Sequence, residues 1–417
     1  MNNADVIVIG AGASGLIAAG IAAQQGKSVI LLEKKTRPAI KLSITGKGRC
    51  NVTNSADLKE FVDNFGNNGK FLYSAFSKFF NIDTINFFEE LGVKCNLERG
   101  GRYFPESNDA HDIVNALIKF IKNNNVKIIT GSEVTKFVCK DKKIESVLLK
   151  NGTQLSATKF VLATGGKSYP LTGSTGDGYN LAKSVGHTII KPQPALVPLV
   201  SDDKNLKQLN KLKLKNIEIS VLSNNKVVTK LFGEIEFTVF GLTGPLILKV
   251  SSQVFSLLEQ KKSVEISINL KPALDDKQLD DRLVRELNNF GNLPVRNMLK
   301  TLLPMQMIEP FMDKNNIKWT ETCSAINKEK RKKIFDGLRN IKFKIISTRP
   351  IDEAIITKGG ISLKEVEQNT MKSKLVENLY FCGEILDIDG PTGGFNLQAA
   401  FSTGYLAGQL EDWRIVK

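Results

Sequence analysis

The hydrophobic pattern at the start of the chain describes a strand, a turn, a helix and a second strand. Residues 6–9 form a short β-branched run, typical of a buried parallel strand. Glycines in a G-x-G-x-x-G pattern follow it, and an alanine-rich stretch without charge then favours a helix. A second apolar run, residues 29–32, ends at Glu33. The pattern therefore predicts a Rossmann-type β–α–β unit.

Farther along, apolar periodicity predicts more helices and strands. We expect helices around residues 70–91 and 111–122, followed by a small β-meander. The meander strands are residues 126–129, 133–139 and 144–149, with an Asn-Gly turn at 151–152. Another buried strand, residues 159–163, runs into Thr164-Gly165-Gly166, so we expect it to join the first sheet and to deliver a loop to its edge.

The middle of the chain has a different pattern. Pro192, Pro194 and Pro198 mark the exit from the first domain. Strand-like segments follow, whereas residues 275–335 carry helical periodicity and more charge. Glycine-rich signals return after residue 350, where a short strand precedes an amphipathic helix that opens at Gly393-Gly394.

We therefore expect an α/β fold with three parts. Both chain ends, residues 1–195 and 346–417, build a discontinuous Rossmann domain. A β-barrel-like substrate domain is expected from residues 196–274 and 336–345, and residues 275–335 are expected to form a helical insertion within it.

Each residue of the N-terminal turn has its own task. Gly10 permits the tight turn, Gly12 lets the backbone approach a pyrophosphate, and Gly15 lets the helix pack on the strand. The helix N terminus at Ala13-Ser14 directs unpaired N–H groups and a positive dipole end at the phosphates. Glu33 stands where a carboxylate accepts hydrogen bonds from an adenosine ribose, so the unit predicts a bound dinucleotide.

Contributions from both chain ends favour FAD, because a flavin dinucleotide spans a long groove and needs several loops. Asp387, which follows Gly383 and Glu384, is expected to bind the ribityl hydroxyls or the pyrophosphate region. The helix that begins near Gly394 is expected to direct its N terminus at the flavin, where it favours the negative charge of the reduced ring.

The distribution of charge bears on the partner. The formal net charge is +15, and residues 201–345 hold 26 basic and 17 acidic side chains, against 32 and 26 in the rest of the chain. The dense cluster at residues 328–333 is the strongest local patch. This excess has two interpretations: a solubility surface, in which that cluster is a solvated helix face, or a surface for a polyanion such as RNA.

Other features limit the classes of site. The five cysteines are scattered, and His111 and His187 are the only imidazoles, so neither a zinc site nor a disulfide framework is expected. The uncharged stretch 6–23 contains the glycines of a turn, and no basic leader precedes it. We expect no metal, no membrane span and no signal peptide, and therefore a cytoplasmic protein.

Several motifs together resemble the BaiN/RdsA-type flavoproteins. They are Gly46-Lys-Gly-Arg-Cys-Asn-Val-Thr-Asn54, Gly101-Arg-Tyr-Phe-Pro105, Ala163-Thr-Gly-Gly-Lys-Ser-Tyr-Pro170, Phe237-Thr-Val-Phe-Gly-Leu-Thr-Gly-Pro245 and Gly383 to Asn396. The resemblance implies FAD in a glutathione-reductase-like Rossmann domain and the reduction of carbon–carbon double bonds. Members act on steroid-like bile acids or make dihydrouridine in large-subunit ribosomal RNA, and a related branch is assigned to aminoacetone oxidation.

The loop 46–54 is expected to fold over the flavin. Arg49 is a candidate phosphate ligand and Asn51 a candidate partner of the ring or ribityl chain. Cys50 is a candidate donor of the proton that accompanies hydride transfer, with a small packed thiol as the alternative. Arg102 and Tyr103 are candidate substrate contacts. The expected cofactor-binding set is Gly10, Gly12, Ala13, Ser14, Gly15, Glu33, Lys34, Lys41, Gly48, Arg49, Asn51, Thr164, Gly165, Gly383, Glu384, Asp387, Gly393, Gly394, Phe395 and Asn396.

The expected activity is hydride transfer from flavin N5 to an activated C=C bond. Uridine in large-subunit ribosomal RNA is the leading substrate, because the resemblance and the basic middle domain agree. A small-molecule flavin oxidase or reductase, acting on an amine, an aminoketone or a steroid-like enone, is the alternative, and a flavin-bound RNA-binding factor without turnover is a third. The sequence contains no second dinucleotide fingerprint, so NAD(P)H is expected to dock transiently, unless the substrate itself reduces FAD and oxygen reoxidises it.

Overall fold

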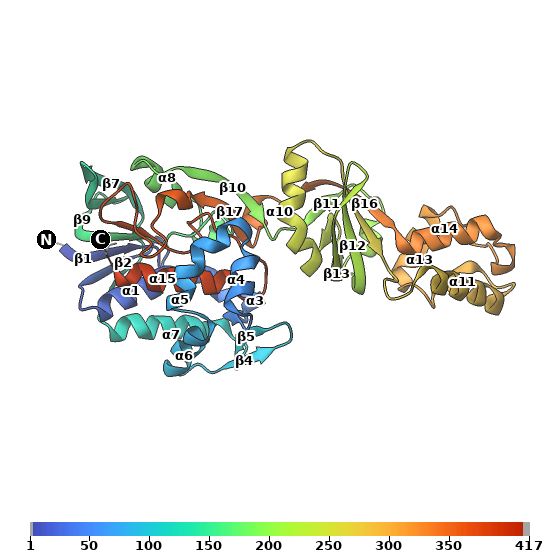
Figure 1. The fold of residues 1–417 in the computed structure, drawn as a ribbon, viewed down its shortest axis with the longest axis horizontal. Coiled ribbons are helices and arrows are strands. Elements are labelled where there is room, and N and C mark those ends of the chain that lie inside the picture. Colours follow the sequence, from blue (N-terminus) through green and yellow to red (C-terminus); the bar gives the residue numbers. More distant parts are fainter. Residues whose placement is uncertain (1–2, 412–417) are drawn as a thin grey trace. The chain divides into compact units, whose positions relative to one another are not determined.

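The computed structural model describes residues 3–411, which fold into two compact units (Figure 1). The first unit is built from the two ends of the chain, up to Ala195 and from Ile351 onward, and the second from Leu196–Pro350. Each unit has its own buried apolar core. The second unit extends past residue 345, the border expected from sequence, because strand β16 (Ile341–Thr348) continues to pair there.

A seven-stranded sheet forms the centre of the first unit, in the order β6-β2-β1-β9-β8-β7 with β18 also beside β9. The strands are β1 (Asn3–Ile9), β2 (Val29–Leu32), β6 (Lys127–Ile129), β7 (Val134–Lys140), β8 (Lys143–Leu149), β9 (Gln154–Leu162) and β18 (Leu379–Phe381). The pairs β1/β2, β1/β9, β2/β6 and β9/β18 are parallel. The carboxyl ends of these strands therefore meet at one edge of the sheet.

Strand β9 pairs with two neighbours, β8 on one side and β1 on the other, and it is longer than the sequence pattern predicts. Its first residues pair antiparallel with β8, and from Ser156 onward it pairs in parallel with β1. The first residues of β9 are largely polar and lack the pattern of a buried strand, so the sequence predicts a strand only at residues 159–163. The meander consists of β7, β8 and β9, whereas β6 belongs to the parallel part beside β2.

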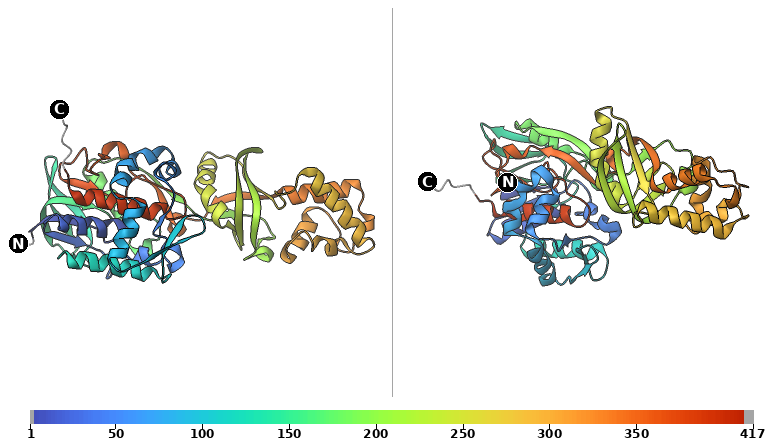
Figure 2. Two further views of the ribbon diagram at one scale, coloured as in Figure 1. Left: turned by 60° about the horizontal axis from the view of Figure 1, so that its bottom comes forward. Right: turned by 45° about the vertical axis from the view of Figure 1, so that its right-hand side comes forward.

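Helix α1 (Ala13–Gln24) lies against α15 (Phe395–Gln409) and α7 (Ala110–Asn123), and Figures 1 and 2 show the first and last helices side by side. Glycines permit this close approach. A Cβ added to Gly404 would lie 2.5 Å from the Ser14 carbonyl oxygen, and one added to Gly408 would lie 2.7 Å from that of Ala18. Helices α1 and α15 therefore run parallel, with Gly404 beside Ser14 and Gly408 beside Ala18.

The remaining elements of the first unit surround this layer. The helix expected at residues 70–91 is split at Phe79-Phe80, whose backbone is extended, with an Asp83 side chain capping the second part. The further helices are α2 (Ile40–Ser43), α3 (Thr45–Gly48), α4 (Leu58–Asn64), η1 (Gly66–Leu72), α5 (Tyr73–Lys78), α6 (Asn81–Glu90) and α8 (Asp177–Ser184). The smaller sheets are β3 (Thr53–Asn54), β5 (Arg102–Pro105) and β4 (Cys95–Glu98) in that order, and the pair β10 (Ile189–Ala195) and β17 (Ile356–Ile361).

The second unit confirms the expected barrel with a helical insertion. Six strands close in the order β11-β14-β13-β12-β15-β16. They are β11 (Leu199–Ser201), β12 (Lys213–Ser223), β13 (Lys226–Thr238), β14 (Gly241–Thr243), β15 (Val264–Asn269) and β16. The helices are α9 (Leu206–Leu209), α10 (Pro245–Glu259), α11 (Asp276–Phe290), α12 (Val295–Leu299), α13 (Met305–Lys314) and α14 (Lys328–Arg339).

An aromatic pair fills the barrel interior. The rings of Phe237 and Phe343 meet edge to face with centroids 5.3 Å apart, and both side chains are buried. We expect Phe343→Ala to reduce the free energy of unfolding by about 3–5 kcal/mol, because it removes a buried ring and the edge-to-face contact with Phe237. The matched control is Phe232→Ala, which removes a ring that is 65% exposed. Thermal unfolding of the full chain checks this, and equal melting temperatures for the two variants would contradict it.

Candidate functional site

The turn between β1 and α1 leaves a helix N terminus open at the carboxyl edge of the sheet. Gly10 has φ +102°, and a Cβ there would lie 2.5 Å from the Ala163 carbonyl oxygen. A Cβ on Gly15 would lie 1.9 Å from the Gly10 carbonyl oxygen. At Gly12, the N-cap of α1, a Cβ would have no protein atom within 4 Å, and no side chain caps the helix. The first turn of α1 therefore has no side-chain cap, and the space beside Gly12 is free of protein atoms.

Glu33 lies beside this turn, directly after β2. Its carboxylate accepts hydrogen bonds from the Ala11 amide (3.0 Å) and the Lys35 amide (2.8 Å), and the side chain is half-buried. A carboxylate has about four lone-pair sites, so it retains capacity for hydroxyl donors. The position fits the ribose contact expected from the sequence.

A second open helix N terminus belongs to α15. Its N-cap, Gly394, has φ +99° and no side-chain cap, and a Cβ there would lie 2.3 Å from the Thr53 carbonyl oxygen. The Asn51 amide, oriented by its hydrogen-bonding partners, accepts from the Gly394 amide (2.9 Å) and donates to the Tyr103 carbonyl (3.2 Å). Asn54 donates to the Gly393 carbonyl (2.8 Å). The loop 46–54 therefore holds the start of α15.

The two helix N termini are separated along their shared direction. Because Gly404 of α15 lies against Ser14 of α1, the N-cap Gly394 extends beyond the N-cap Gly12 by roughly 12 Å at 1.5 Å per residue. One open terminus can thus face a pyrophosphate while the other faces a distant group of the same ligand. This spacing suits a long cofactor.

Two buried hydroxyls near this edge have no hydrogen-bond partner. Thr164 Oγ1 follows β9, and Tyr179 lies on α8. Helix α8 packs closely on Thr164, since a Cβ on Gly178 would lie 1.9 Å from Thr164 Oγ1. Burial raises the pKa of the Tyr179 phenol, with Glu384 and Asp387 adding to the effect. Tyr179 was not among the expected residues, because a tyrosine on an ordinary helix gives no local signal.

Several expected cofactor ligands instead brace the loops of the site. Glu384 accepts from Lys41 (2.7 Å), from Ser168 Oγ (3.1 Å) and from the Thr357 amide (2.7 Å). Lys34 is paired with Asp177. Asn396 exchanges two 2.8 Å hydrogen bonds with the Gly390 backbone.

Other expected residues are covered or tied elsewhere. Phe395 is buried, with its ring centroid 4.6 Å from that of Phe61. A Cβ on Gly383 would lie 2.3 Å from Ser14 Oγ, so this glycine serves close packing. Gly165 and Gly48 have positive φ and shape their loops. The structure thus brings most of the expected set to one edge, while it gives many members protein partners.

The structure argues against Cys50 as a proton donor. The side chain is fully buried, so it has no surface with which to touch a substrate in this conformation. Burial raises the pKa of the Cys50 thiol to about 12, against a smaller opposing contribution from a hydrogen bond with Thr45. The packed-thiol alternative agrees with both observations.

Two carboxyls lie in the loop between β18 and α15. Burial raises the pKa of Asp387, although hydrogen bonds from Asn68 and the Gly359 amide oppose the shift. Burial raises the pKa of Asp389 to about 6; nearby Asp387 adds to this, and Lys358 opposes it. Asp389 therefore keeps its proton to a higher pH than an ordinary aspartate does. The expected set did not include it, because its burial depends on residues far away in sequence.

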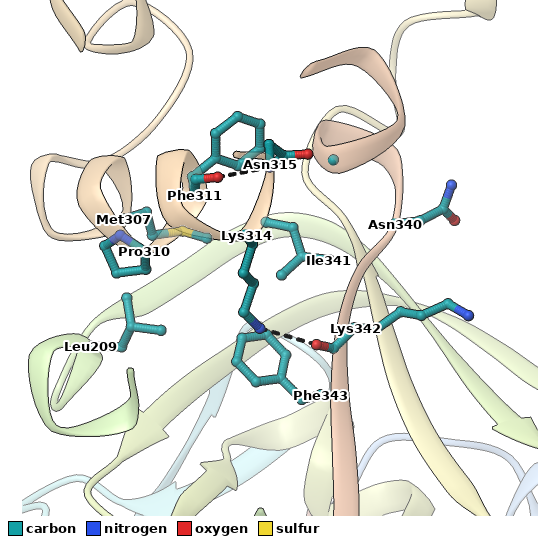
Figure 3. A pocket seen from close by; sticks show the side chains of 11 residues that line it. Leu209, Met307, Pro310, Phe311, Lys314, Asn315, Asn340, Ile341, Lys342 and Phe343 are labelled. Atoms are coloured by element: carbon teal, nitrogen blue, oxygen red, sulfur yellow. Dashed lines mark hydrogen bonds between the residues drawn. The ribbon is translucent and has the colours of Figure 1, made fainter. Parts of the chain in front are cut away.

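A cavity of about 260 Å³ in the second unit is a weaker candidate (Figure 3). Met307, Phe311 and Phe343 give it apolar walls. Its central cation, Lys314, already forms an ion pair with Asp203 (2.5 Å) and donates to the Lys342 carbonyl (3.1 Å). The central cation of the cavity is therefore already engaged by protein partners.

The described part of the chain also bears on metal-dependent and membrane-bound classes of function. Within residues 3–411, no three histidine, cysteine or carboxylate side chains converge as metal ligands would. Among the helices of the same described part, none is long and apolar enough to cross a membrane.

A long cofactor with an anionic middle accounts for both open helix N termini and for the unpaired hydroxyls of Thr164 and Tyr179. This is the arrangement of a Rossmann-type FAD domain, and the chain is an FAD-dependent oxidoreductase. Over residues 4–410 it belongs to the family described as the HI0933-like protein Rossmann domain.

Relatives cover the chain almost end to end. It is 31% identical over 407 residues to the ribosomal RNA dihydrouridine synthase of Haemophilus influenzae, across 96% of each chain. It is 29% identical over 404 residues to the 3-dehydro-bile acid delta(4,6)-reductase of Clostridium scindens, across 96% of this chain and 97% of that one. The open conformation of a flavocytochrome c3 fumarate reductase shares the fold, with a TM-score of 0.55 and 17% identity over 98% of this chain and 78% of that one.

Gly12 and Gly15 give opposite expectations. Gly12→Ala adds a Cβ to open space, so we expect an unchanged melting temperature for the cofactor-free chain but FAD retention reduced at least about tenfold, since a backbone approach is blocked. Gly15→Ala meets the Gly10 carbonyl and is expected to lower the melting temperature with or without FAD. Visible flavin absorbance and thermal unfolding check both. Full FAD retention by Gly12→Ala would contradict the placement of the cofactor.

Asp389 should make stability depend on pH. Because its folded pKa of about 6 lies above the ordinary value near 4, folding favours the protonated form, and stability falls as pH rises from about 4 to 6. We expect Asp389→Asn to remove this loss and to raise the unfolding free energy at pH 8 by about 1–2 kcal/mol, with no gain at pH 4. Melting temperatures across this range measure it. The control is Asp281→Asn, at an exposed site, and a similar pH profile for the two variants would contradict the assignment.

Proposed function

We propose that the protein reduces the C5–C6 double bond of uridine in large-subunit ribosomal RNA to form dihydrouridine. The likeness to the Haemophilus influenzae ribosomal RNA dihydrouridine synthase carries this proposal, because it covers 96% of the chain and so includes both units. Action on RNA would place the protein in the cytoplasm.

The charge of the second unit supports an RNA substrate, although not through the cluster at residues 328–333. Within that cluster, Arg331 pairs with Asp280 (2.9 Å) and Lys333 with Glu329 (2.9 Å), as expected of a solvated helix face. A better surface lies where the β12–β13 turn meets the start of β15. The backbone N–H of Asn224 donates to the Ser263 carbonyl (3.0 Å). This hydrogen bond brings the exposed lysines of the two segments close together. These are Lys226, Lys261 and Lys262.

Different residues of the chain have different roles in the proposed reaction. Bound FAD would supply the hydride, and NAD(P)H is proposed as its transient reductant. Glu33 and the first turn of α1 would hold the dinucleotide, and Asn51 fixes the Gly394 amide at the start of α15. We propose Asp389 in place of Cys50 as the proton donor, because it lies in the loop that leads to the start of α15 and burial favours its protonated form.

A second candidate is the reduction of a small-molecule enone. The Clostridium scindens bile acid reductase favours it, because that likeness is equally extensive at 29% identity. This candidate requires NAD(P)H turnover with a small substrate alone and no dependence on the lysines of the second unit. An oxidase would instead release peroxide when its substrate reduces the flavin.

Deletion of the gene should remove dihydrouridine from large-subunit ribosomal RNA, as measured by mass spectrometry of nuclease fragments. Expression of the intact chain should restore it. The matched control is Gly12→Ala, which is expected to fold without retaining FAD and therefore to fail. Restoration by this variant would favour an RNA-binding factor without turnover, and unchanged dihydrouridine after deletion would overturn the proposed substrate.

A further inference from the structure

An arginine pair lies beside the start of α15. Arg49 and Arg102 both face the carboxylate of Glu98: Arg49 forms an ion pair with it, and the Arg102 guanidinium lies 4.0 Å away. Both guanidinium groups also lie over the Phe104 ring, at 4.1 and 5.6 Å from its centroid. The two guanidinium groups thus share the Glu98 carboxylate and both lie over the Phe104 ring.

The charge of this cluster is not balanced locally. Each guanidinium has five N–H donors, and a single carboxylate cannot occupy them all. Asn108 accepts from Arg49 Nε (2.7 Å), and the Arg99 carbonyl accepts from Arg102 Nε (3.0 Å), so these contacts orient the planes without neutralising them. Arg102 is exposed, and exposed Lys47 and Arg99 lie in the same two loops.

Hydrogen bonds connect this cluster to the candidate cofactor site. Asn51 bridges the Tyr103 carbonyl and the Gly394 amide, and Asn54 bridges the Gly100 carbonyl (3.2 Å) and the Gly393 carbonyl (2.8 Å). The β4–β5 hairpin, which carries Arg102, is therefore hydrogen-bonded to the residues in front of α15. A ligand held by the arginines would lie next to the proposed reaction centre.

We propose that Arg49 and Arg102 form a phosphate clamp that binds the RNA backbone of the substrate, with Glu98 as the positioning residue. This rests on the proposed function. The planar guanidinium fork matches phosphate oxygens in two-point contacts, and Glu98 holds both forks in place before binding. A phosphate is also present in NAD(P)H, so the experiment must separate the two sources.

The test measures binding of a fluorescein-labelled oligouridine to the FAD-loaded full chain by fluorescence anisotropy. We expect Arg102→Gln and Arg49→Gln each to weaken binding roughly tenfold and to lower the salt slope by about 0.7, as for one phosphate contact on a single strand. Glu98→Gln should also weaken binding but leave the salt slope unchanged, because it removes the carboxylate that holds both guanidinium groups and removes no phosphate contact. The control Lys136→Gln removes the same charge at an exposed site on β7 and should change binding less than about twofold.

The second arm follows flavin reduction by NADPH without oxygen. The clamp requires an unchanged rate in Arg102→Gln, and a loss in this arm alone would assign the phosphate to the dinucleotide and overturn the proposal. Equal effects of Lys136→Gln and Arg102→Gln on oligouridine binding would also overturn it. If gene deletion leaves dihydrouridine unchanged while oligouridine binding still depends on the arginines, uridine reduction fails and the clamp stands.

Discussion

The close contact between α1 and α15 is the constraint on which the site depends. Gly404 and Gly408 remove the side chains that would separate the helices, and Gly15 holds α1 against the turn after β1. Both helix N termini are consequently fixed at the same edge of the sheet. The second unit interrupts this arrangement without disturbing it, because the chain leaves through β10 and returns through β17, which are antiparallel neighbours.

Polar side chains in the glycine-rich motifs mainly stabilise the loops themselves. Glu384 joins three segments, and Asn396 fastens the loop before α15 to its own helix. A buried backbone group costs free energy unless it is paired, so loops of this kind need such braces. The braces leave the first-turn amides of α1 and α15 uncapped, and those amides provide the favourable potential for an anionic cofactor.

A charged side chain of this protein indicates a binding surface only when its ion-pair partners within the chain are known. The cluster at residues 328–333 is the most basic stretch of the sequence, yet ion pairs compensate much of it. Arg49 and Arg102 are isolated in sequence and share one carboxylate in space. The net charge of a segment therefore does not identify a binding surface, because local ion pairs decide which of its cations remain available.

The sequence by itself determined the Rossmann unit with Glu33 after its second strand. It also indicated the inserted barrel and a Rossmann domain built from both ends of the chain. These follow from short-range spacing and periodicity, which local sterics impose. Only the tertiary structure decided the double role of β9, the burial of Cys50, the raised pKa of Asp389 and the meeting of Arg49 with Arg102. Each of these depends on residues distant in the chain, and a single residue carries no local signal of what will cover it.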